Sequence, residues 1–149
     1  MKFTPLQIGL GPPQSRPRLV LDVLDYAHPD TAEPADLDLM HCRVTAIAHP
    51  LEAPFEMNIG LWELFDLRDY LQKISSGNGP SQSFMLAAGL LTLSFAPSKR
   101  GPVLCAVLVK TIDAAHLRLE FLITLEPADI SRTLFEFSQL RAHAAPHTS

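Results

Sequence analysis

Hydrophobic and polar residues alternate along much of the chain with the two-residue period of a half-buried β-strand. In RLVLDVLDY, for example, Leu19, Leu21 and Val23 fall on one face. A proline-rich connector, GPPQSRP, follows the first short apolar run, and neither a helix nor a central strand tolerates it. Strands are predicted before residue 62 at 6–10, 18–26, 36–48 and 54–61.

The period changes to that of an amphipathic helix in LWELFDLRDYLQKI, where leucines recur three and four residues apart. The glycine-rich segment SSGNGPSQS ends this run, so a helix is predicted over 63–75. A second helix is predicted from Pro127, because proline suits the first helical turn and Ile130, Leu134 and Phe137 form an apolar stripe.

Three further strands are predicted between the helices, at 83–97, 101–112 and 116–126, joined by short links that suit antiparallel hairpins. The middle one, VLCAVLV, is apolar on both faces, so we expect another element to cover its second side. No internal repeat is visible in the sequence.

The expected fold is therefore a two-layer α+β domain with a mostly antiparallel sheet of about six to seven strands and two helices. The order is strands, helix, three-strand meander, helix. A single domain over 1–149 is predicted, with an acidic connector at about 27–36 and a loose tail at about 143–149.

Composition is that of a globular protein, with 47% hydrophobic and 19% charged residues. Cys42 and Cys105 lie in apolar strand-like runs, which predicts buried free thiols and a reducing compartment. No signal peptide is recognisable, and the apolar stretch FMLAAGLLTLSFA is too short to be a membrane helix. A cytoplasmic protein without a membrane association is predicted.

Acidic residues are concentrated in one segment, since six of them and no Lys or Arg occur between Asp22 and Asp38. With a formal net charge of −4, this argues against nucleic-acid binding, which needs basic residues to replace phosphate counterions. The segment is either a solvated loop or a surface that steers a basic protein partner. The candidate partner-binding residues are Asp25, Asp30, Glu33, Asp36 and Asp38.

No catalytic or metal-binding motif stands out, so no catalytic residues, metal or cofactor are predicted. His41 and His49 would lie roughly 26 Å apart on one strand, and no Cys-x-x-Cys or His-Glu-x-x-His spacing occurs. Nucleophile-elbow and phosphate-loop patterns are missing too. Trp62, the only tryptophan, is either a core residue at the first helix or an exposed interface anchor.

Three stretches, LWELFDLRDYLQKI, LLTLSFAPSKRGPVLCAVLV and LRLEFLITLEPADISRTLFEFSQL, resemble the WapI-like bacterial immunity proteins. The similarity covers about residues 61–140, including Gly101 to Val103 at a strand turn. It implies a non-enzymatic cytoplasmic protein that binds and neutralises a cognate polymorphic or contact-dependent toxin domain. It lends no catalytic residues.

Two alternatives stay open. An acidic secretion chaperone or adaptor would hold a segment of a secreted protein and would normally be a dimer with exposed apolar grooves. A small-ligand-binding domain or hydrolase would need a concave pocket with converging polar groups.

Overall fold

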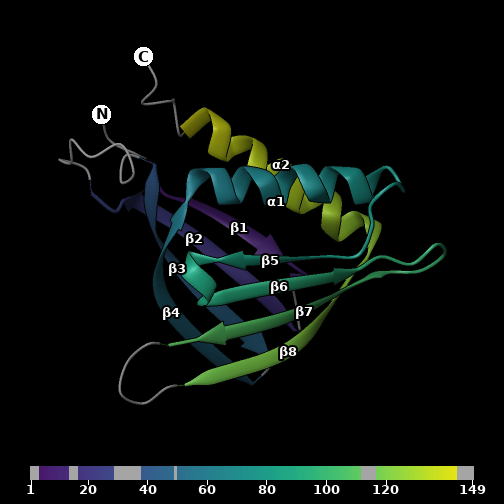
Figure 1. Ribbon diagram of the computed structural model, residues 1–149, viewed down its shortest axis with the longest axis horizontal. Coiled ribbons are helices and arrows are strands. Elements are labelled where there is room, and N and C mark those ends of the chain that lie inside the picture. The colour runs from purple at the N-terminus through teal and green to yellow at the C-terminus, as the bar shows by residue number, and fades with distance from the viewer. Residues whose placement is uncertain (1–3, 14–16, 29–37, 49, 112–116, 144–149) are drawn as a thin grey trace.

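A computed structural model describes residues 4–13, 17–28, 38–48, 50–111 and 117–143 (Figure 1). It contains eight strands in two antiparallel four-stranded sheets, and two α-helices. The first sheet has the order β1 (Leu6–Leu10), β2 (Arg18–Tyr26), β3 (Leu39–Ala48), β4 (Leu51–Gly60), and α1 (Leu61–Ser75) follows it. The second has the order β5 (Gln82–Leu86), β6 (Leu91–Ala96), β7 (Val103–Lys110), β8 (Arg118–Leu125), and α2 (Pro127–His143) follows it.

The α+β class is confirmed, whereas the prediction of six to seven strands in one sheet is wrong. The segment predicted as one strand over 83–97 contains β5 and β6, joined by the 3-10 turn η2 (Ala87–Gly89). Ala87 and Ala88 have φ values of 53° and 55°, a left-handed conformation that non-glycine residues adopt at a cost. Gly89 is the one turn-forming residue type of the three, and a single glycine in an apolar run is compatible with a strand, so the pattern predicts one continuous strand.

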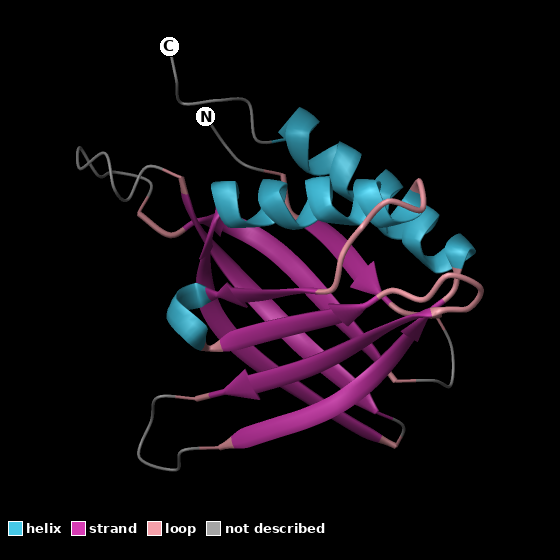
Figure 2. Cartoon of the chain, turned by 45° about the vertical axis from the view of Figure 1, so that its right-hand side comes forward, coloured by secondary structure: helices cyan, strands magenta, loops and turns pink. Residues whose placement is uncertain are grey.

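The two sheets lie against each other with their strands crossing, and both helices lie along one side of the pair (Figure 2). Their inner faces and the helices share one hydrophobic cluster. Each helix covers the sheet of the other half of the chain. Tyr70 of α1 packs on Phe84 and Phe95 of the second sheet at ring-centroid distances of 5.2 Å. Thr133 Oγ1 of α2 donates to the carbonyl oxygen of Gly9 in β1.

The two halves repeat one unit, a four-stranded meander followed by a helix, although no repeat is visible in the sequence. The strand registers define the equivalence. Cys42 pairs with Val23 and Met57 in the first sheet, and Cys105 pairs with Phe95 and Ile123 in the second, so the two buried cysteines occupy the same place. Other equivalent pairs along the ladders are Leu10 and Leu86, Leu19 and Leu91, Val44 and Val107, and Ile59 and Leu125.

The helix starts are equivalent as well. Glu63 Oε2 accepts a hydrogen bond from the Gly60 amide at 2.7 Å, and Asp129 Oδ2 accepts one from the Glu126 amide at 3.0 Å. Each acid sits three residues after the residue that it caps, where a carboxylate also meets the positive end of the helix dipole. The buried positions that follow have the same spacing: Leu64, Leu67, Leu71 and Ile74 in α1, and Ile130, Thr133, Phe137 and Leu140 in α2.

Exposed apolar side chains on the second sheet correct another expectation. Within the described part of the chain no element covers the outer face of β7 and β8, where Leu104 and Leu122 are 38% and 52% exposed. The equivalent positions of the first sheet are His41 and Glu56, whose side chains form an ion pair at 3.1 Å. The inner faces of the two units are therefore alike, and their outer faces differ.

Candidate partner-binding site

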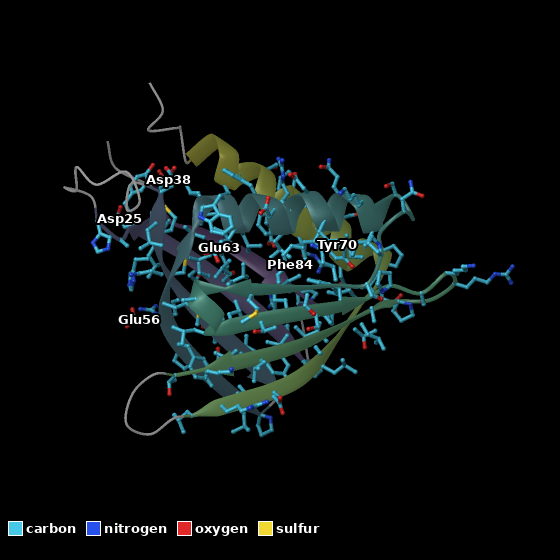
Figure 3. The ribbon with its side chains drawn as sticks, in the orientation of Figure 1. Asp25, Asp38, Glu56, Glu63, Tyr70 and Phe84 are labelled. Carbon is cyan, nitrogen blue, oxygen red and sulfur yellow. The ribbon has the colours of Figure 1, made fainter. Side chains whose placement is uncertain are left out.

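The two described members of the predicted acidic set lie at the end of the molecule where α1 begins. Figure 3 places Asp25 and Asp38 at this end, together with Glu63. Asp38 is fixed to the helix start because its carbonyl oxygen accepts a hydrogen bond from the Leu61 amide at 2.8 Å. The Asp25 side chain accepts one from the Tyr26 amide at 2.8 Å. Asp30, Glu33 and Asp36 lie outside the described residues.

Negative charge converges on this end of the molecule. Burial raises the pKa of the Tyr26 hydroxyl, and the nearby carboxylates of Asp38 and Asp25 raise it further. Among the described residues, no Lys, Arg or His forms an ion pair with Asp25, Asp38 or Glu63. The field of these carboxylates is therefore directed toward solvent and can act on a cation from outside.

Trp62 lies at the same end of the molecule as these carboxylates. It is 67% exposed, so the prediction that it is a core residue is wrong. It is the second residue of α1, and its indole lies over Gly60. A Cβ atom added at Gly60 would come within 2.7 Å of the indole Nε1. Glycine at this position therefore lets the ring lie against the backbone. An exposed tryptophan held by its surroundings has the character of an interface anchor.

A groove runs from Trp62 to the turn between β5 and β6, and we call it the Trp62 groove. Its lining includes Leu39, Asn58, Trp62, Glu63, Met85 and Leu90, together with the Ala87–Gly89 turn. Met85 is 69% exposed. Sequence reasoning missed this feature because it placed Met85 within one long strand, and no motif links that strand to the helix start.

The histidines and cysteines do not form a second site in the described part of the chain. His41 Nε2 lies 3.1 Å from Glu56 Oε1, and no group of three His, Cys, Asp or Glu side chains there could hold a metal. His49 lies outside the described residues. Burial raises the pKa of the Cys42 and Cys105 thiols to about 12, so both remain protonated and unreactive at neutral pH.

A pocket lies beside the start of α2, but few polar side chains line it. Its lining is mainly glycine, proline and aliphatic side chains, with Ser75, Ser98 and Ser131 as the hydroxyl groups. None of the described residues that line it is titratable. Proton transfer in this pocket would have to rely on groups that the described lining does not provide.

No helix within the described ranges is long and apolar enough to cross a membrane. No protein-family model, curated protein or solved structure matches the sequence.

Proposed function

We propose that this protein is a non-enzymatic immunity protein, which neutralises a cognate toxin domain by binding a basic surface of that domain with its acidic end. The observation that carries the proposal is the exposed Trp62 amid carboxylates without ion-pair partners in the described residues. The resemblance of residues 61–140 to WapI-like immunity proteins supplies the biological role.

Binding of this kind combines electrostatic steering with an anchor residue. Carboxylates on one end speed the encounter with a cationic surface and orient it, although they add little affinity by themselves. Affinity comes from desolvated anchors, and tryptophan is among the residues most enriched at such positions. Toxin domains that cut nucleic acids have basic clefts, so an acidic protein end can occlude the cleft.

The experiment is capture from the native host with tagged protein, at low and at moderate salt. The variant Asp25→Lys/Asp38→Lys reverses the two described charges. The control, Glu52→Lys/Glu120→Lys, makes the same change in net charge at exposed positions on the outer sheet faces, where Glu120 pairs with Arg118 at 2.8 Å. We expect the wild type and the control to capture the C-terminal toxin domain of one large secreted protein, and the acidic-end variant to lose it. Equal capture by both variants would contradict the proposal.

A second candidate, an acidic secretion chaperone or adaptor, is favoured by the exposed leucines of the second sheet. Leu104 and Leu122 lie on an outer face with small or hydroxyl neighbours such as Ala106, Ser94 and Thr92, while Lys110, Arg118 and Glu120 occupy one end of the same face. A face of this kind suits an extended apolar segment of a client. Capture of an intact secreted protein through this face, together with a dimer in solution, would support the chaperone. A monomer that captures only a toxin domain would support immunity.

A further inference from the structure

The repeat within the chain makes it possible to compare the open Trp62 groove with an equivalent surface in the other half. The ladders place Gly9 at the position of Met85 and Gly11 at that of Ala87. Gly11 and Ala87 both have positive φ, at 108° and 53°, where the chain leaves the two edge strands. The helix starts place Asp129 at the position of Glu63.

Two arginine side chains of the chain itself occupy the equivalent surface. Arg132 Nη1 lies 3.2 Å from Asp129 Oδ1 and 3.4 Å from the carbonyl oxygen of Gly11. Arg18 Nη1 donates to the carbonyl oxygen of Pro13 at 3.3 Å. Its Nη2 lies 2.7 Å from where a Cβ of Gly9 would be, so the guanidinium lies directly over the strand. Guanidinium groups thus fill the space between the helix-capping acid and the strand end.

In the Trp62 groove those two arginines have no counterpart. Asp66 stands in place of Arg132, and Leu90 stands in place of Arg18. The capping acid is retained, since Glu63 occupies the place of Asp129. Glu63 Oε2 accepts a hydrogen bond from the Gly60 amide, and Glu63 Oε1 has no hydrogen-bond partner among the described residues. The groove therefore combines an acceptor oxygen with an aromatic face and lacks the cation that its equivalent holds.

We propose that the Trp62 groove binds an arginine side chain of the basic partner, with the guanidinium stacked on the Trp62 indole and paired with Glu63. This inference rests on the proposed function for the identity of the partner. The occupant is chosen by charge complementarity and by the arginines that fill the equivalent surface. Arginine fits better than lysine because its planar group stacks on an indole, presents several donors at fixed angles and is weakly hydrated.

The strained turn at the far wall of the groove agrees with a binding role. Ala87 and Ala88 are the described non-glycine residues with positive φ, and both belong to this wall. Backbone held in such conformations is concentrated at binding and catalytic sites, where the surrounding structure maintains it. The first half has Gly11 at the position of Ala87, and glycine adopts positive φ without steric cost.

Fluorescence of the sole tryptophan reports directly on the groove. The probe is the peptide acetyl-Gly-Ser-Leu-Arg-Leu-Ser-Gly-amide, titrated into the full-length protein up to millimolar concentration. Two matched peptides carry citrulline, an uncharged isostere, or lysine in place of arginine. The first protein variant is Glu63→Gln, which keeps an acceptor for the Gly60 amide. The second is Glu52→Gln, which removes one charge eight residues before Gly60, about 26 Å along β4.

We expect a saturable change in Trp62 emission with the arginine peptide, about tenfold weaker binding of the citrulline peptide, and an intermediate affinity for lysine. Glu63→Gln should weaken binding of the arginine peptide about three- to tenfold and leave the citrulline peptide unchanged. Glu52→Gln should change neither. Equal binding of the arginine and citrulline peptides, no saturation with any peptide, or equal effects of the two protein variants would each overturn the inference.

The result separates this inference from the proposed function. Loss of toxin capture by Asp25→Lys/Asp38→Lys without arginine selectivity would leave the immunity role in place and remove the arginine site. Arginine selectivity without capture of a basic toxin domain would retain the site and contradict the immunity role.

Discussion

Thr133→Val tests whether α2 holds the first sheet through the edge of β1. Thr133 is 1% exposed, and its hydroxyl donates to the carbonyl oxygen of Gly9. The same hydroxyl also lies 3.0 Å from the carbonyl oxygen of Asp129, four residues earlier in α2, so its proton is shared between the two acceptors. Valine keeps the shape and removes the donor, so the edge carbonyl loses its partner from α2.

We expect the free energy of unfolding to fall by about 1–2 kcal/mol, the usual cost of leaving a buried polar group without its partner. For a chain of this length that change lowers the melting temperature by about 3–6 °C. Urea unfolding followed by far-UV circular dichroism measures the change. Thr124→Val is the matched control, because Thr124 lies on the outer face of β8 and is only half-buried.

The control should change the unfolding free energy by no more than about 0.5 kcal/mol. Glu136 supplies a second test of the same contact, since its Oε1 accepts a hydrogen bond from the Gly9 amide at 2.8 Å. Glu136→Leu should therefore destabilise the protein as well, and the two effects should be non-additive because both act on one residue of β1. A Thr133→Val variant as stable as the control would contradict the claim that α2 stabilises β1 through this hydrogen bond.

Three further predictions concern stability. Burial raises the pKa of the Cys42 and Cys105 thiols to about 12, so above pH 9 the folded state keeps both protons while the unfolded state releases them. The free energy of unfolding should therefore fall by about 1 kcal/mol per thiol between pH 9 and pH 10. In urea unfolding, the Cys42→Ala/Cys105→Ala variant should show a flatter decline over this range. Neither half of the chain, 1–80 or 81–149, should give a cooperative thermal transition by itself, because each helix packs on the other half's sheet; a cooperative transition of either half would contradict that arrangement. Leu125→Ala should cost about 2–5 kcal/mol of unfolding free energy and Leu122→Ala less than about 1, since Leu125 is fully buried and Leu122 is 52% exposed; equal costs in chemical unfolding would show that the outer face is covered.

Local signals predicted the helices and most strands well. The leucine spacing in α1 and the proline that opens α2 are both determined within a few residues, so helices at 63–75 and from Pro127 needed no tertiary information. The strand β4 was predicted from residue 54 and begins at Leu51. Pro54 is tolerated inside it because β4 is an edge strand, where the missing N–H faces away from the sheet.

The repeat could not be predicted because it is carried by the inner faces alone. Cys42 and Cys105 are identical, but their outward neighbours Arg43 and Ala106 have nothing in common. Alternate residues along each strand therefore hide the similarity in a linear comparison. The left-handed turn at Ala87 and Ala88 was missed for another reason, since tertiary packing holds residues there that do not favour the conformation.

The candidate site was predicted only in part. A run of carboxylates is visible in any sequence, and Asp25 and Asp38 do lie on one end of the molecule. Their association with Trp62 and Met85 depends on how α1 and β5 pack, which no local pattern encodes. The position of the Trp62 ring could not be predicted either, because it depends on the absence of a side chain at Gly60.

The most direct test of the central claim is the association rate of the captured toxin domain with the immobilised protein, measured over a range of salt concentrations. We expect Asp25→Lys/Asp38→Lys to slow association about tenfold at low salt and to flatten its salt dependence, and Glu52→Lys/Glu120→Lys to behave much more like the wild type. The same association rate and the same salt dependence for both variants would contradict a partner-binding role for the acidic end.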